Sequence, residues 1–172
     1  SAAAEKREQL IDRLLASNAF VESWAMRLGR LLRLRSQQDK NKATITPKAV
    51  RTYHGWITDH LREGTGYDEI ARALLTGTGD TETVGPAGFY NTTEDPLLQT
   101  EFMTEVLLGS RMRCANCHNH PLDKWTQDDF HGLTAIFAKV TRGTMVRVSP
   151  LGKAIHPQTG QPARMKVPGE RF

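Results

Sequence analysis

The chain has 172 residues and a net charge of +4, with 38% of its residues hydrophobic and 24% charged. That length supports one domain with its own core, and the composition excludes a disordered chain and a disulfide-rich scaffold. Its apolar runs are far shorter than a bilayer span requires, and its first residues lack the pattern of a signal peptide. The small positive charge does not predict a nucleic-acid partner.

Hydrophobic periodicity predicts a mainly α-helical fold, a single-domain helical bundle with long loops. Apolar residues recur at helical spacing in residues 2–16, 19–35, 47–62, 67–75, 96–112 and 127–137. Thr46 and Asp95 each precede a proline, the usual order of an N-cap and the first helical residue. Thr126 and Asp129 have the spacing of a capping box. These signals predict where three of the helices begin.

Two of the predicted helices carry distinctive surfaces. The first has an apolar stripe among charged residues, made of Leu10, Ile11, Leu14 and Leu15. In the second, arginines alternate with leucines over residues 27–35. We interpret this basic stretch as the solvated face of an amphipathic helix, with an anion or partner site as the alternative.

The remaining segments are predicted to be irregular. Residues 37–43 are polar, and residues 76–93 are rich in Gly and Thr, so both are predicted loops, the second long enough to be functional or mobile. Residues 145–148 alternate like a short strand, and residues 153–172 read as an extended tail. We therefore expect a helical cytochrome-c-like part, residues 1–140, and an extended C-terminal segment of the same domain, residues 141–172.

Both cysteines of the chain lie in one motif, Cys114-x-x-Cys117-His118. This is the pattern of c-type haem attachment, in which two thiols three residues apart form thioethers with the two vinyl groups of a porphyrin. The histidine that follows is placed to bind the iron as the proximal ligand. The motif therefore predicts haem c, attached through Cys114 and Cys117 and ligated by His118.

Other uses of the same residues remain open. Cys114, Cys117 and His120, with either His118 or His131, could ligate zinc tetrahedrally. The two cysteines could form a redox dithiol, although a helix should begin at such a motif and here the predicted helix precedes it. They could also form a simple disulfide or be two buried thiols.

Residues 113–138 resemble the second planctomycete cytochrome-like domain family, whose function is poorly defined. Shorter similar elements bring the resemblance to most of the chain: residues 10–17, Trp24, residues 67–68, 107–109 and 156–160. Members of that family usually have a further helical segment before this part and a further domain after it. The resemblance therefore implies a module of a larger parent protein, whose flanking domains are among its partners. The basic residues of 29–43 depart from the family pattern.

If haem is bound, its sixth ligand decides the chemistry, because an open position permits ligand binding whereas His or Met favours electron transfer. Met145 follows the last predicted helix, where the chain can return across the haem, and His156 lies in a family-like element; the choice stays open. His120 could hold a propionate, orient His118 or ligate another metal. Trp125 could support the site through its indole N–H.

The sequence contains no nucleophile–base constellation, phosphate loop or paired catalytic carboxylates, so a binding or electron-transfer module is predicted in preference to an enzyme. We expect a c-type cytochrome-like module with a redox protein as its partner. Bacteria attach haem c outside the cytoplasm, which predicts the periplasm or the cell surface. One alternative is a structural or interaction domain whose Cys/His cluster holds a metal such as zinc or a disulfide. Another is a ligand-binding or peroxidatic haem.

Overall fold

The computed structural model describes residues 2–35, 45–93 and 95–170, with side chains from Glu5 onward. The expected loop at residues 37–43 lies outside the described residues. The described α-helices are α1 (Ala2–Leu15), α2 (Asn18–Leu31), α3 (Pro47–Glu63), α4 (Tyr67–Thr76), α5 (Pro96–Leu107) and α6 (Gln127–Phe137). Short elements complete the fold: strands β1 (Gly79–Asp80) and β2 (Met145–Val146), and the 3₁₀ helices η1 (Gly85–Asn91) and η2 (Met112–Asn116). The fold is mainly α, as predicted.

The helices begin at the capping residues that the sequence indicates. Thr46 Oγ1 accepts a hydrogen bond from the Ala49 N–H (3.1 Å) at the start of α3, and Asp95 Oδ1 accepts from the Leu98 N–H (2.9 Å) at the start of α5. At α6 the Thr126 side chain accepts from the Asp129 N–H, and the Asp129 carboxylate accepts from the Thr126 N–H. These bonds satisfy backbone donors that a helix leaves unpaired in its first turn.

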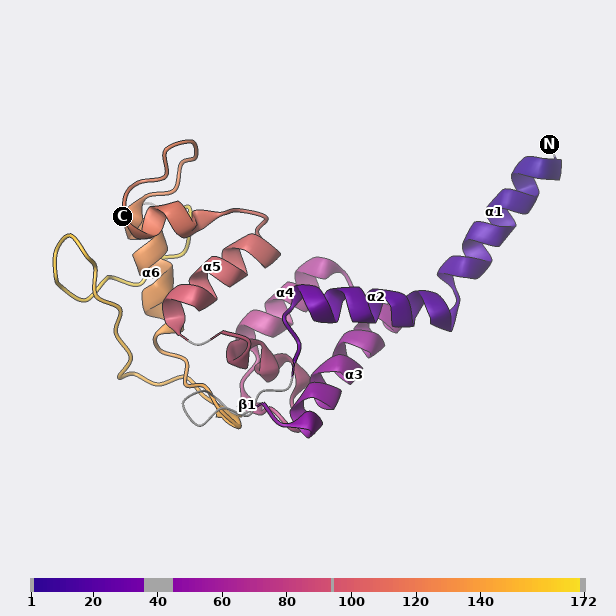
Figure 1. Cartoon of the computed structure of the whole chain (residues 1–172), viewed down its shortest axis with the longest axis horizontal. Coiled ribbons are helices and arrows are strands. Elements are labelled where there is room, and N and C mark those ends of the chain that lie inside the picture. Colours follow the sequence, from indigo (N-terminus) through magenta and orange to yellow (C-terminus); the bar gives the residue numbers. More distant parts are fainter. Residues whose placement is uncertain (1, 36–44, 94, 171–172) are drawn as a thin grey trace.

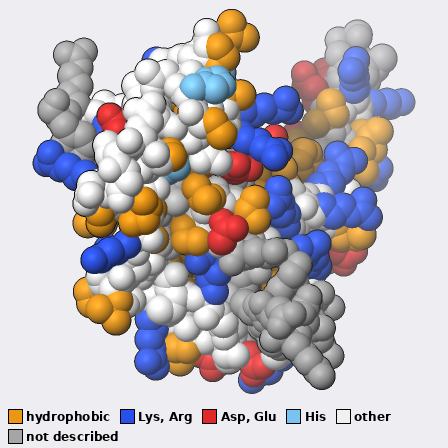
Figure 2. All heavy atoms as spheres, turned by 60° about the vertical axis from the view of Figure 1, so that its left-hand side comes forward, with side chains coloured by type: hydrophobic (Ala, Val, Ile, Leu, Met, Phe, Trp, Pro, Cys, Tyr) orange, Lys and Arg blue, Asp and Glu red, His pale blue; other side chains and the backbone are white. Residues whose placement is uncertain are grey.

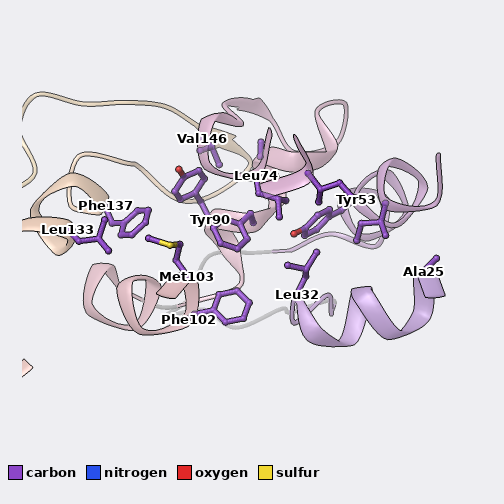
Figure 3. Close-up of a cluster of buried hydrophobic side chains, with 14 residues drawn as sticks. Ala25, Leu32, Tyr53, Leu74, Tyr90, Phe102, Met103, Leu133, Phe137 and Val146 are labelled. Carbon is purple, nitrogen blue, oxygen red and sulfur yellow. The ribbon is translucent and has the colours of Figure 1, made fainter. Parts of the chain in front are cut away.

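The helices form two groups that meet in one core. In the first group α2 packs on α3, and η1 packs on α3 and α4; in the second, α5 packs on α6 and both contact η2 (Figure 1). Rings from both groups close the core, since Phe89 of η1 stacks on Phe102 of α5 with ring centroids 5.6 Å apart. Tyr90 likewise contacts Phe137 of α6 (Figure 3). No helix of the described residues is long and apolar enough to cross a membrane.

Helix α1 leaves its apolar stripe largely exposed. It contacts α2 and extends away from the rest of the molecule (Figure 1). The four stripe residues are 44–55% exposed: Leu10, Ile11, Leu14 and Leu15. Periodicity identifies which side of a helix is apolar, but it does not identify an element that covers that side.

Residues 76–93 are also not the open loop that their Gly and Thr content predicts. The segment contains β1 and η1, and six of the seven η1 residues are buried, Pro86 being the exception. Phe89 is completely buried and belongs to the main core cluster. Its glycines permit this burial, because Gly85 lies against Trp56 and Gly88 lies against Tyr53, both on α3. Glycine has no side chain, so at these two positions it lets the η1 backbone approach the α3 side chains closely.

The C-terminal segment is packed onto the helical part. Strand β2 pairs antiparallel with β1, with Gly79 opposite Val146, and Val146 is fully buried in the core. The predicted strand is thus confirmed over two residues. Farther on, Lys166 Nζ lies 2.6 Å from Asp129 Oδ1. Burial alone would raise the pKa of Asp129, but hydrogen bonds from Lys166 and Thr126 outweigh burial and hold this pKa below its ordinary value.

Two glycines of the first group test the packing of η1 on α3. Gly55→Ala adds a methyl group in mid-helix with no atom within 4 Å, and should raise the free energy of unfolding by about 0.5–1 kcal/mol. Gly85→Ala adds a methyl group that overlaps the Trp56 side chain and lies 3.1 Å from the Thr52 carbonyl oxygen. It should lower the free energy of unfolding by about 1–3 kcal/mol. Urea denaturation measures both, and equal effects would contradict this packing.

Candidate functional site

The haem-type motif occupies a single turn at η2. The Cys117 and His118 N–H groups both donate to the Cys114 carbonyl oxygen, at 3.3 and 3.4 Å. These bonds keep the two cysteines and the histidine together. Both thiols are free and exposed, so the turn has neither the disulfide nor the two buried thiols considered as alternatives. Figure 2 views this side of the molecule and shows a histidine side chain at the surface among hydrophobic side chains.

Side chains of helix α6 hold this turn in place. Asn116, between the two cysteines, accepts hydrogen bonds at its carbonyl oxygen from Gln127 Nε2 (3.0 Å) and His131 Nε2 (2.9 Å). Met112 of η2 is completely buried against Phe130 of α6. The backbone of the turn is therefore fixed, while its reactive side chains stay exposed.

The two histidines of the loop differ in which ring nitrogen is free. Nδ1 of His118 lies 2.8 Å from the Asn119 carbonyl oxygen. A carbonyl can only accept, so Nδ1 carries a proton, and in the neutral imidazole Nε2 of this exposed side chain keeps its lone pair. Nδ1 of His120 instead accepts from the Leu122 N–H at 3.2 Å, so neutral His120 carries its proton on Nε2. His118 thus has the tautomer of a metal-binding histidine, in which Nδ1 donates to a backbone carbonyl.

A cavity of about 580 Å³ adjoins the motif between α5 and the loop of residues 111–122. Cys114 and His120 line it, together with apolar side chains of Leu98, Phe102, Met112 and Leu122. Charged side chains also line it: Arg33, Glu101, Glu105, Arg111 and Arg113. The three arginines outnumber the two glutamates, so the charged groups carry a net positive charge.

The arginines at this cavity come from distant parts of the chain. Arg33, from the basic stretch after α2, lies over the Phe102 ring with its guanidinium carbon 4.4 Å from the ring centroid. Arg111 and Arg113 lie 3.4 and 3.7 Å from Glu105 and Glu101 of α5. All three arginines are exposed, so their guanidinium groups can turn toward an anionic group in the cavity.

A family model described as PSCyt2, protein of unknown function (DUF1549), matches residues 1–142. The chain belongs to the PSCyt2 family. No curated protein and no solved structure matches it. The description of PSCyt2 assigns no function, so family membership establishes the relationship without establishing haem.

In this PSCyt2 member, Trp125 supports the loop and does not line the cavity. Its indole N–H donates to Ser110 Oγ at 2.6 Å, and its carbonyl oxygen accepts from the His120 N–H at 2.8 Å. The ring packs against the small cluster that contains Met112 and Phe130. These contacts join both ends of the loop that carries the motif.

The structure does not bring Met145 or His156 to the cavity beside Cys114. Met145 lies on β2 opposite Asp80 and is 41% exposed. His156 is buried against α6, where its Nε2 lies 3.1 Å from Asp128 Oδ1 and its ring meets the His131 ring edge-on. The two residues considered as the sixth ligand therefore lie at other sites in this structure.

The zinc alternative requires four grouped side chains. Across residues 2–35, 45–93 and 95–170, no three His, Cys, Asp or Glu side chains are grouped as metal ligands. His131, one of the candidate ligands, instead donates its Nε2 proton to the Asn116 carbonyl oxygen. His131 therefore supports the backbone of the motif, a role that its position in the sequence does not indicate.

Proposed function

We propose that this PSCyt2 domain is a c-type cytochrome-like module that holds one haem through Cys114 and Cys117, with His118 as the iron ligand. The single observation that carries the proposal is the state of the motif's side chains. Two free, exposed thiols share a turn with a histidine whose Nδ1 proton is given to a backbone carbonyl, which leaves Nε2 for a metal.

The adjoining cavity supports the proposal because its walls match the two halves of a haem. Leu98 and Leu122 offer exposed apolar surface for a flat tetrapyrrole ring, and Arg33 and Arg113 offer cations for its carboxylates. A volume of about 580 Å³ lies within the range of cofactor sites. The residues present therefore fit the group.

Attachment needs no oxidant or leaving group. Each thiol S–H adds across one vinyl C=C, so that sulfur bonds to one carbon and the proton goes to its neighbour. The protein then gains the full mass of one haem. A haem so held supplies a one-electron redox centre. We propose electron transfer with a redox protein outside the cytoplasm as its use, because the motif is exposed at the surface where a partner can approach.

A second candidate is a ligand-binding haem. It is favoured by the positions of Met145 and His156, which do not line the cavity beside Cys114. Carbon monoxide distinguishes the two uses. A large, immediate shift of the Soret band in the reduced protein indicates an open sixth position, whereas a closed position resists the shift.

His118 and His120 form a matched pair of variants for this proposal. His118→Ala should lower the yield of haem-loaded protein by more than about tenfold, since loss of a supporting group alone costs 10–100-fold in metal affinity. His120→Ala should stay within about twofold of the wild type, because its Nε2 carries a proton and its side chain only caps the Leu122 N–H. The haem absorbance of each variant, made with a haem-attachment system, measures this. Equal losses would contradict the assignment of the ligand.

A further inference from the structure

Arg33 has a backbone conformation that arginine rarely adopts. Its φ is +55°, and every other residue with a positive φ in the described part of the chain is a glycine. The left-handed region crowds the Cβ atom of an L-residue against the backbone, so glycine usually occupies such positions. A larger residue that is held there nonetheless points to a role for its side chain.

The end of helix α2 imposes this conformation. The Leu34 N–H donates to the Gly29 carbonyl oxygen at 2.8 Å, and the Arg33 N–H donates to the Arg30 carbonyl oxygen at 3.1 Å. These are the two hydrogen bonds of a Schellman motif, whose left-handed residue is most often glycine. A glycine at this position would make the same turn without strain. The turn alone therefore does not explain the arginine.

The guanidinium of Arg33 is the unbalanced positive charge of the cavity beside the attachment motif. Arg111 and Arg113 each lie near a glutamate carboxylate of α5, at 3.4 and 3.7 Å. Arg33 instead contacts the Phe102 ring, and no acceptor in the described part of the chain takes a hydrogen bond from it. Its side chain is exposed and lines the cavity, so its N–H donors are available to a ligand there.

We propose that Arg33 binds a carboxylate of the tetrapyrrole in this cavity and so selects a ring that carries propionate groups. The planar fork of an arginine matches the two oxygens of a carboxylate, and a hydrogen bond between two charged groups is among the strongest that a protein makes. The inference deepens the proposed function and rests on it. The two thiols and His118 hold the ring and its iron, whereas Arg33 recognises the acidic edge of the ring.

The probe for this role is mesoporphyrin IX, compared with its dimethyl ester. Mesoporphyrin IX has ethyl groups in place of the vinyl groups and no iron, so it forms neither a thioether nor a bond to His118. Fluorescence titration of the whole chain should give an affinity for the free acid about tenfold higher than for the ester, which has no charge for Arg33 to bind. Equal affinities, or no binding of the acid, would overturn the proposal.

Arg33→Gln and Arg30→Gln form the matched pair of variants, because each removes one positive charge near the end of α2. Arg30 is exposed and does not line the cavity. Arg33→Gln should therefore lose the preference for the acid over the ester, and Arg30→Gln should keep it. Equal preferences in the two variants would contradict the role of Arg33.

Arg33→Gly separates binding from packing. Glycine adopts the left-handed conformation freely, and this relief offsets the lost contact with the Phe102 ring. The variant should unfold at a urea concentration close to that of the wild type and yet lose the preference for the acid. A much lower urea midpoint with an unchanged preference would make Arg33 a packing residue and overturn the proposal.

The intact mass of the wild-type chain, co-expressed with a haem-attachment system, tests the proposed function separately. Covalent haem on a chain that shows no preference for the acid would reject only the role of Arg33. A preference for the acid that Arg33→Gln abolishes, on a chain that gains no covalent haem, would support the role of Arg33 and reject only the attachment.

Discussion

Replacing both Cys114 and Cys117 by serine is expected to abolish covalent haem completely. Serine hydroxyls do not add to vinyl groups under the conditions in which thiols do, because the sulfur nucleophile is far stronger. The chain has two cysteines, so no other thiol can substitute. In protein co-expressed with a haem-attachment system, intact mass should show the full haem addition in the wild type and none in the double variant.

The variants around this pair separate attachment from folding. Each single serine variant keeps one thiol and should retain haem in lower yield. Asp123→Ser changes an exposed residue of the same loop and should carry haem as the wild type does. Both cysteines are exposed, so the double variant should unfold at a urea concentration close to that of the wild type. Haem mass on the double variant would refute thioether attachment.

Phe89→Ala is expected to cause the largest loss of stability of any single change considered. The ring is completely buried, stacks on Phe102 and meets Tyr90 edge-on with centroids 5.7 Å apart. Removing it leaves a cavity where η1 joins the two helix groups. The free energy of unfolding should fall by about 3–5 kcal/mol, measured by urea denaturation followed by circular dichroism.

Two further variants calibrate this result. Phe89→Leu keeps part of the packing and should lose less stability than Phe89→Ala, so it remains measurable if the alanine variant is largely unfolded. Leu151→Ala removes a side chain that is 83% exposed and should change the free energy of unfolding by no more than about 0.5 kcal/mol. A loss below about 1 kcal/mol in Phe89→Ala would mean that residues 85–91 are the mobile loop that composition suggests.

Local signals in the sequence predict local structure well. The Thr46 and Asp95 caps, and the capping box of Thr126 and Asp129, form as predicted because each needs only neighbouring residues. The stripe of α1 and the burial of η1 were not predictable in this way. Both depend on which distant element covers a surface, and neither periodicity nor glycine content contains that information.

In the candidate site too, local features were predictable from the sequence and contacts between distant residues were not. The spacing of Cys114, Cys117 and His118 is local, and the structure keeps the three on one turn. The approach of Arg33 to Phe102, and the support of Asn116 by His131, join residues that are remote in sequence. The choice of His118 over His120 as the iron ligand depends on which backbone group bonds to each Nδ1. That group is a carbonyl oxygen at His118 and an N–H at His120, and only the folded loop defines this difference.

The central claim is that this turn carries one haem through two thioethers. The most direct measurement is the reduced pyridine haemochrome spectrum of the wild-type chain co-expressed with a haem-attachment system, recorded with the intact mass of the same sample. A c-type band together with the added mass of one haem is the predicted result. An unmodified mass with no Soret band would contradict the claim, and elemental analysis of that sample would then test for zinc.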